Sequence, residues 1–373
     1  MNYTPKQRML NAYRGIFSDR YPVAPEFWYY YPAKIMGVDM IQFEKEIPFW
    51  KALQVTFKKY ETEGWGIVFP VSRLPIPTKS SFKKISETQY RQIDTVAIGS
   101  KKFSSTIIYD KKEPSWLTEY PVKDEADVLP YLDMLLSPET DFDFKPAVEA
   151  HNIVGEDYLL ELGLGVPFFD FIACFMGFEK ALLYFADQDA AALSDIRDRY
   201  IKSQLEYIRK ACSQTNFESF CVGCGYSNNS LIGPRMWRQW DKPYIAAVAA
   251  ELHKQGKLLH VHIHGKCLET VPEFAEIGLD CVCPFERPPG GDVDGLDGLK
   301  KARASLAGKV TMNGNVHTVE TLIRGNPEKV RAEVREIKAA FIGEPRLIIG
   351  TGDQVGRETL EENITAMVAE AKA

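Results

Sequence analysis

Three of the six histidines in the sequence fall in one short stretch, LLHVHIHGK. His260, His262 and His264 alternate with apolar residues, so in a β-strand all three side chains point to one face. Residues two apart lie roughly 6.6 Å apart along a strand, so two imidazoles can converge on one cation, whereas residues four apart lie roughly 13 Å apart. The pair nearest Gly265, His262 and His264, is therefore predicted to bind a metal ion, with His260 one layer deeper. The alternative is a set of core histidines that are satisfied by hydrogen bonds.

Two carboxylates follow apolar runs and could complete such a site. Glu286 comes shortly after DCVC, and Asp353 comes shortly after LIIGT. A carboxylate close to a buried strand is costly unless it is paired or binds a cation. Two histidines with one or two carboxylates form a hard nitrogen and oxygen site suited to zinc, with another divalent ion as the alternative. The competing structural roles are an ion pair of Glu286 with Arg287 and a turn cap by Asp353 beside Gly352.

Other polar and aromatic residues also follow predicted strands. Two of them are candidate catalytic residues, each with a structural alternative: Glu161, which could pair with a base, and Asn315, which could cap the next helix. An aromatic wall suits a flat substrate, although core packing is the alternative for each ring. The candidate substrate-binding residues are Trp28, Tyr29, Tyr30, Asn228, Asn313 and His317. Cys267 is a reserve metal ligand, whereas Cys281 and Cys283 are expected to pack in the core.

Eight short apolar runs are predicted to be the strands that position these residues. They cover 22–27, 65–70, 157–162, 218–223, 257–263, 279–283, 308–313 and 346–351. Helices are predicted between them, among others over 178–211, 234–255 and 326–342. Strands that alternate with helices of this length indicate a parallel sheet. Eight such units favour an α/β fold of the (β/α)8 or TIM-barrel class, whose active sites lie where the strands end.

The first half of the chain departs from this regular pattern. Residues 80–120 are predicted to form an inserted β-hairpin, with runs 87–98 and 102–109 joined by a turn, and a helix is expected near 124–136. An N-terminal helical extension near 5–15 is expected to cover the bottom of the barrel. The sequence has no low-complexity tract, repeat or domain linker, so residues 1–373 are predicted to form a single catalytic domain.

Composition and missing motifs exclude several classes of function. With 45 basic and 51 acidic residues the net charge is −6, which argues against nucleic acid or an anionic membrane as the main partner. No apolar run reaches about 18 residues and no signal-peptide core opens the sequence, so we expect a cytoplasmic protein whose seven cysteines are reduced. The phosphate-binding motifs GxGxxG and GxxxxGK[ST] and the serine-hydrolase motif GxSxG are absent.

Several segments of the sequence resemble the uroporphyrinogen decarboxylase superfamily, in particular its cobamide-dependent methyltransferase branch. They are GYSNNSLIGPRMWRQWDKPY, HIHG, DCVCPFE, MNGNVH and GTGDQVGRETLEENI, and the resemblance is strongest over 218–373. Members of that branch hold zinc with an H-x-C pair, a later glutamate and a cysteine near the last strand. The resemblance implies that His262, His264, Glu286 and Asp353 take these four positions here, with two sulfur ligands replaced.

The resemblance implies a zinc-dependent methyltransferase that is similar to the first component of O-demethylase systems. A methyl group would pass from a methoxylated, aromatic substrate to a corrinoid, and an ion without sulfur ligands is the harder Lewis acid suited to an ether oxygen. The cobalamin-binding pattern D-x-H-x-x-G is absent, so the corrinoid is expected on a partner protein. The alternatives are a methylcorrinoid:thiol methyltransferase, a metal-free decarboxylase and a non-catalytic ligand-binding barrel. The decarboxylase alternative is disfavoured, because the segment VAPEFWYYYP is aromatic where a decarboxylase of this superfamily has arginines. The oligomeric state stays open, with a homodimer as one alternative.

Overall fold

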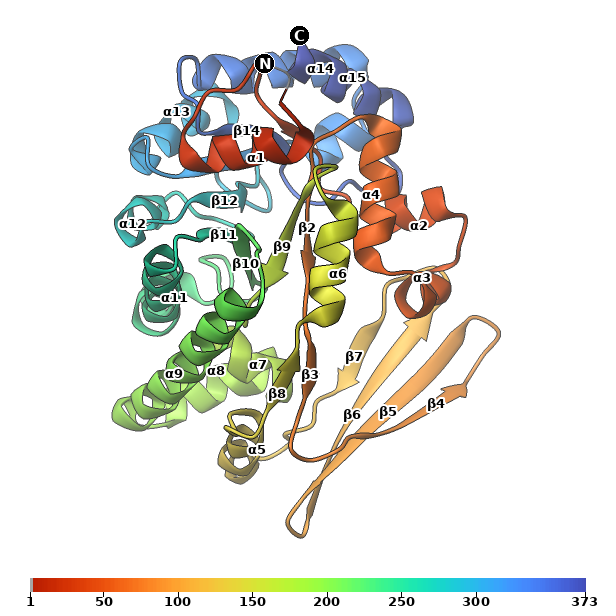
Figure 1. The fold of residues 1–373 in the computed structure, drawn as a ribbon, viewed down its shortest axis with the longest axis vertical. Helices are drawn as coiled ribbons and strands as arrows, with labels where there is room; N and C mark the ends of the chain where they lie inside the picture. Colours follow the sequence, from red (N-terminus) through yellow and green to blue (C-terminus); the bar gives the residue numbers. More distant parts are fainter. Residues whose placement is uncertain (1–2) are drawn as a thin grey trace.

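The structure, a computed structural model, describes residues 3–373. Eight parallel strands form one curled sheet that helices surround (Figure 1). Across the sheet the strands are β1 (Val23–Ala24), β14 (Leu347–Thr351), β13 (Thr311–Val316), β12 (Cys281–Pro284), β11 (Leu258–Ile263), β10 (Ser219–Cys224), β9 (Leu159–Gly163) and β2 (Trp65–Val68). The two edges approach each other, since the backbone N–H of Glu63, just before β2, donates to the carbonyl of Val23 at 3.0 Å. The predicted (β/α)8 class is confirmed, and each predicted run overlaps one of these strands.

The strands of this sheet are buried on both faces, which is why the sequence shows them as nearly continuous apolar runs. In β11, Leu259, Val261 and Ile263 belong to the main hydrophobic core. The alternate residues His260 and His262 face the interior of the barrel. The position of a polar residue within an apolar run therefore tells which side chains point inward.

Helices alternate with the strands and cover the outer face of the sheet (Figure 1). They are α4 (Phe49–Tyr60), α6 (Lys145–Val154), α9 (Ala190–Gln214), α11 (Lys242–Lys254), α12 (Val271–Ile277), α13 (Gly295–Leu306), α14 (Pro327–Ala340) and α15 (Glu361–Lys372). Shorter helices and turns lie in the connections. They are α2 (Tyr30–Met36), α3 (Met40–Glu46), the 3-10 turn η1 (Glu125–Asp127), α5 (Val128–Leu135), α7 (Phe168–Met176), α8 (Phe178–Asp187), α10 (Gly233–Met236) and the π-helical turns η2 (Trp237–Asp241) and η3 (Thr318–Ile323).

Two of the predicted long helices are interrupted. The helix expected over 178–211 is two helices, α8 and α9, because the Asp189 carboxylate accepts from the backbone N–H groups of Ala191 and Ala192 and so begins a new helix. The helix expected over 234–255 is split into α10, η2 and α11. The third is α14, which Asn326 caps as the sequence predicts.

The N-terminal helix α1 (Pro5–Arg14) covers the end of the barrel at which the strands begin. The hydroxyl of Thr311, the first residue of β13, donates to the carbonyl of Ala12 at 2.7 Å. Tyr13 is fully buried, and its ring centroid lies 5.7 Å from that of His260. The predicted helical extension is confirmed, and it closes the barrel below the histidines.

The inserted segment is a larger sheet than the predicted hairpin. The hairpin itself is present as β5 (Gln89–Ile98) and β6 (Lys101–Asp110), and β4 (Lys79–Lys84) and β7 (Trp116–Glu119) extend it to four antiparallel strands. This sheet extends away from the barrel (Figure 1). A small pair, β3 (Val71–Arg73) with β8 (Asp141–Asp143), connects it to the barrel.

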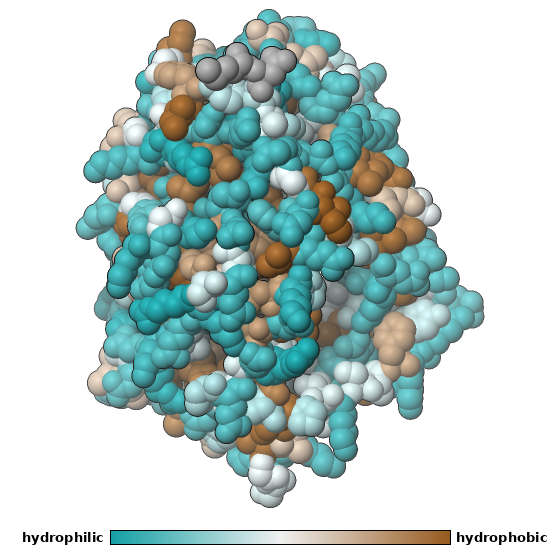
Figure 2. Space-filling view, in the orientation of Figure 1, coloured by the Kyte–Doolittle hydropathy of each residue, from teal (hydrophilic) through white to brown (hydrophobic). Residues whose placement is uncertain are grey.

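The face of the molecule in Figure 2 is covered mainly by hydrophilic side chains, with apolar residues in separate groups. Within residues 3–373, every helix is too short or too polar to span a lipid bilayer.

Candidate metal centre

His262 and His264 face each other at the end of β11 at which the strand leaves the barrel. His262 is inside the strand and His264 follows it, just before Gly265, whose φ is +77°. The two Nε2 atoms lie 2.8 Å apart, and the rings meet edge to face with centroids 4.5 Å apart. The structure thus brings together the two histidines that the sequence selects.

The other nitrogen of each ring is already engaged. Nδ1 of His262 lies 3.0 Å from Sγ of Cys283, and Nδ1 of His264 lies 2.6 Å from Oε1 of Glu286. Burial raises the pKa of the Cys283 thiol well above its usual range. Since each Nδ1 donates to its partner, the lone pairs of the two Nε2 atoms point at each other. Such a pair is repulsive unless a cation lies between them, so these nitrogens fit a metal ion.

In the metal-free protein a proton supplies this positive charge. Burial and the neighbouring histidines lower the pKa of His262 well below 6.5. Burial also opposes protonation of His264. However, the hydrogen bond to Glu286 and the charges of Asp353 and Glu26 outweigh it and raise the pKa of His264 to about 9. The pair therefore holds one proton, on His264, which donates to His262.

Two further carboxyl groups lie around the paired nitrogens. Oε1 of Glu26 is 3.8 Å from Nε2 of His262, and the indole N–H of Trp28 donates to the same oxygen. Burial, together with the charge of Asp353, raises the pKa of Glu26 to about 8. Ligand atoms of His264, Glu286 and Asp353 all lie within 4.8 Å of one another. Burial also raises the pKa of Asp353. A cation bound beside Glu26 and Asp353 would stabilise their carboxylate forms, so both groups would release their protons to solvent when it binds.

Glu286 lies on the far side of His264 from its Nε2. Its Oε1 accepts from Nδ1 of His264 and, at 3.1 Å, from the backbone N–H of Gly265. It therefore orients the ring. The alternative ion pair with Arg287 is absent among the described residues, because that guanidinium instead pairs with Glu333 and Glu336, each at 3.1 Å.

Glu161 lies in the layer below the paired nitrogens and not at the strand end. It is fully buried, with its carboxylate accepting from Ser219 at 2.6 Å and from His260 at 2.8 Å. The partner base expected as the structural alternative is thus His260. Direct contact of Glu161 with a substrate stays a prediction.

Asn315, near the end of β13, and His317, just after this strand, both form hydrogen bonds with backbone groups. The buried amide of Asn315 donates to the carbonyls of Phe285 and Val293, each at 2.9 Å. It does not cap the next turn. That role belongs to His317, whose Nδ1 accepts from the N–H groups at 319 and 320 and whose Nε2 donates to the Pro288 carbonyl at 3.0 Å.

Three further predicted residues have their contacts with groups other than the two histidines. Asn313 is buried and lies against Gly350, where a side chain would overlap its Oδ1. Oδ1 of Asn228 caps its own loop by accepting from the N–H groups of residues 230 and 231. Cys267 is buried in the hydrophobic core and belongs to none of the metal-ligand groupings within residues 3–373.

Of the aromatic residues after β1, only Trp28 lies beside the histidine pair. Its ring stacks on Phe49 with centroids 5.2 Å apart and meets Trp65 edge to face at 5.3 Å. Trp65 in turn lies 5.6 Å from His262. Tyr29 is 36% exposed and packs against Phe49. Trp28 and Trp65 thus form one aromatic side of the site.

Tyr30 and Tyr31 open helix α2 and point elsewhere. The Tyr30 hydroxyl donates to Glu113 at 3.0 Å, while Arg357 lies over its ring at 4.4 Å. The buried Tyr31 hydroxyl donates to the Thr359 carbonyl.

Sequence reasoning missed Glu26, Cys283 and Trp65. Glu26 is the next-to-last residue of the run PVAPEF, and the cost of a carboxylate close to an apolar run would have selected it as it selected Glu286. Cys283 is opposite His262 in the β11–β12 pairing, a register that only the fold reveals.

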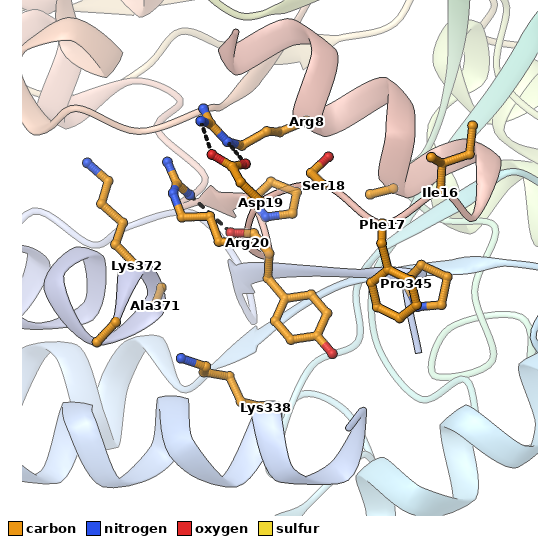
Figure 3. A pocket seen from close by; sticks show the side chains of 14 residues that line it. Arg8, Ile16, Phe17, Ser18, Asp19, Arg20, Lys338, Pro345, Ala371 and Lys372 are labelled. Atoms are coloured by element: carbon orange, nitrogen blue, oxygen red, sulfur yellow. Dashed lines mark hydrogen bonds and ion pairs between the residues drawn. The ribbon is translucent and has the colours of Figure 1, made fainter. Parts of the chain in front are cut away.

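A separate cavity of about 330 Å³ lies at the other end of the barrel (Figure 3). It is lined by α1, by the segment that enters β1 and by the C-terminal helix. Its two guanidinium groups are neutralised, Arg8 by Asp19 at 2.8 Å and Arg20 by Glu63 at 2.6 Å. This cavity is therefore distinct from the histidine site.

Comparisons with known proteins agree with this architecture. A family model described as uroporphyrinogen decarboxylase (URO-D) matches residues 106–373. Among solved structures, a methyltransferase from Methanosarcina mazei is similar with a TM-score of 0.65 and 16% identity, over 99% of this chain and 98% of that chain. No curated protein sequence matches the chain. At this identity the structural likeness shows the fold alone.

Proposed function

Because the chain belongs to the uroporphyrinogen decarboxylase family, we propose that it is a zinc-dependent methyltransferase that moves a methyl group from a methoxylated, aromatic substrate to the corrinoid of a partner protein. The observation that carries this proposal is the pair of facing Nε2 atoms of His262 and His264, 2.8 Å apart. A methyltransferase from Methanosarcina mazei with the same fold supports the class of reaction.

The residues around the histidine pair would have different roles in binding zinc. Nε2 of His262 and of His264 would bind the ion, with Glu26 and Asp353 as candidate oxygen donors and Glu286 orienting the His264 ring. When bound, zinc supplies a Lewis acid that polarises an ether oxygen. Since this set offers nitrogen and oxygen without sulfur, the ion is harder than one with thiolate ligands.

Two tryptophan rings beside the histidine pair indicate the kind of substrate. Trp28 and Trp65 form one side of the site, and such rings pack well against a flat aromatic compound. A corrinoid protein would dock over the rim of the barrel and accept the methyl group, so the chain has to position the substrate and needs no nucleophile of its own.

A metal-free decarboxylase is the weaker candidate. Such an enzyme needs excess positive charge to bind a substrate with carboxylate groups. Here the single protonated ring, His264, is surrounded by Glu26, Glu286 and Asp353. These acidic groups would repel an anionic substrate.

The test is elemental analysis together with methyl transfer from methoxylated aromatic compounds to reduced cobalamin. The wild-type protein should hold zinc in a one-to-one ratio, and the His262→Ala, His264→Ala double variant should lose both zinc and activity. His253→Ala is the matched control, because His253 pairs with Asp280 outside the site. Stoichiometric zinc in the double variant would overturn the assignment.

A further inference from the structure

A continuous row of hydrogen-bonded side chains runs beneath His262 through the barrel interior. Ser219 contacts Glu161 at 2.6 Å, Glu161 contacts His260 at 2.8 Å, His260 contacts Cys283 at 3.0 Å, and Cys283 contacts His262 at 3.0 Å. These residues come from the neighbouring strands β9, β10, β11 and β12. Ser219, Glu161, His260 and Cys283 are at most 2% exposed.

Barrel interiors are usually filled by branched apolar side chains. Burying polar groups costs free energy unless every one of them is hydrogen-bonded. Here Glu161, His260 and Cys283, the members between the two ends, each have partners on both sides. Such a row does more than fill the barrel interior, because its hydrogen bonds fix which nitrogen and oxygen atoms carry hydrogen.

The direction of the hydrogen bonds follows from the chemistry of the groups. The Ser219 hydroxyl donates to one carboxyl oxygen of Glu161, and the other carboxyl oxygen accepts from Nδ1–H of His260. Nε2 of His260 is then an acceptor and takes the single hydrogen of the Cys283 thiol. With its hydrogen used, the sulfur can only accept from Nδ1–H of His262. Nε2 of His262 is left with a lone pair at the rim.

We propose that Glu161, His260 and Cys283 are positioning residues that hold the hydrogen of His262 on Nδ1 and so present its Nε2 to the metal ion. Partners of this kind, beyond the direct ligands, orient metal-binding imidazoles in proteins. The inference rests on the proposed function for the identity of the ion. In the metal-free protein the proton of His264 favours the same tautomer by donating to Nε2, so the contribution of the row is measured without that proton.

The row also separates this role from metal binding by Cys283. Glu26, His262 and Cys283 offer donor atoms within 4.8 Å of one another, so a thiolate ligand is the rival interpretation. However, the sulfur contacts Nδ1, and the facing pair uses Nε2, on the other side of the ring. A ligand and a positioning residue respond differently to substitution by serine.

The experiment compares Cys283→Ala, which removes the acceptor, with Cys283→Ser, which keeps a hydroxyl that can both donate and accept. Cys281→Ala is the matched control, because Cys281 is equally buried two residues earlier in β12 and is opposite His260, whereas Cys283 is opposite His262. Imidazole ¹⁵N shifts report which nitrogen of His262 carries hydrogen; for this measurement each metal-free protein also carries His264→Ala, so that no proton from His264 holds Nε2 of His262. Zinc dissociation constants come from competition with a chelator.

The wild-type, Cys283→Ser and Cys281→Ala proteins should show hydrogen on Nδ1 of His262. The Cys283→Ala protein should show a mixture of both tautomers and bind zinc about tenfold more weakly or worse. An unchanged tautomer in Cys283→Ala would overturn the inference. So would equal loss of zinc in Cys283→Ser and Cys283→Ala together with a thiolate-to-metal charge-transfer band in the cobalt-loaded wild type, since these mark a direct ligand.

A replacement variant and the metal-free measurement cover the two ways in which the experiment could fail. Should Cys283→Ala fail to fold, Cys283→Val fills the space of the thiol without hydrogen bonding and takes its place. Should the wild-type protein bind no zinc, the proposed function fails. The ¹⁵N shifts of the metal-free variants still decide whether the row sets the tautomer of His262.

Discussion

The Nε2 atoms of His262 and His264 lie 2.8 Å apart, while the Nδ1 atom of each ring is hydrogen-bonded to a different partner. This relationship makes the end of β11 a site for positive charge. A proton satisfies it in the metal-free protein, and a divalent ion can replace that proton. The replacement of the His264 proton by a divalent ion, and the residues around the two rings, lead to measurable consequences.

Zinc affinity should increase with pH. Zinc must displace the proton that His264 holds, and the pKa of His264 is raised to about 9. The affinity should therefore rise by about tenfold per pH unit for each proton released and level off near pH 9, because metal binding requires deprotonated ligands. Loss of the proton from Glu26, with a pKa of about 8, adds to the slope below that pH. Zinc titrations at several pH values measure it, and an affinity that is flat up to pH 9 would contradict this picture.

The same proton stabilises the metal-free fold. Since the pKa of His264 is higher in the folded protein than its ordinary value of 6.5, the stabilisation is complete below about pH 6.5 and is lost as the pH rises through about 9. Chemical unfolding of the metal-free protein at increasing pH should show this loss. The His264→Ala variant should lack that part of the pH dependence.

Glu26→Gln should weaken zinc binding by about tenfold or more, as removal of a group that contacts the ion or its ligands does. Glutamine keeps an oxygen that can accept the hydrogen bond of Trp28, so the change isolates the charge. Zinc retained after dialysis against a chelator is the measurement. Glu328→Gln, at an exposed position on α14, is the control and should retain wild-type zinc. Equal zinc in both variants would remove Glu26 from the site.

Trp28→Leu should raise the KM for methoxylated aromatic substrates and leave kcat close to the wild-type value. An aromatic contact contributes about 0.5–1.5 kcal/mol, which corresponds to about twofold to tenfold in KM. Trp116→Leu is the control, because Trp116 is exposed on β7 of the inserted sheet. If Trp28→Leu lowered kcat alone, the ring would not be a binding surface.

Asp189→Ala should destabilise the protein by about 1 kcal/mol, the usual cost of losing an N-cap. Its carboxylate accepts from two N–H groups at the start of α9. Thermal unfolding measures the effect, with Asp187→Ala, at the end of α8, as the control. An equal effect of the two substitutions would mean that the break between α8 and α9 has another cause.

The sequence predicts the barrel well because its strands are buried on both faces and so appear as apolar runs. It predicts the inserted sheet less completely. All six residues of β4 are exposed, so this strand has no apolar face that a pattern could reveal. The break before α9 depends on one capping side chain, Asp189, inside an otherwise helical pattern.

The histidine pair was predictable because its spacing follows from strand geometry alone. The surrounding groups depend on contacts between strands. Glu26 comes from the segment after β1, and Cys283 reaches His262 through the register of β11 with β12. Asn315 and His317 donate to backbone carbonyls of the connection after β12, which the spacing of residues does not reveal.

X-ray absorption spectroscopy of the zinc-loaded protein shows directly whether His262 and His264 bind the ion. We expect a first shell of two imidazole nitrogens and additional oxygen donors at about 2.0–2.2 Å, with no sulfur. A zinc–sulfur distance of about 2.3 Å, or a first shell without imidazole, would contradict it.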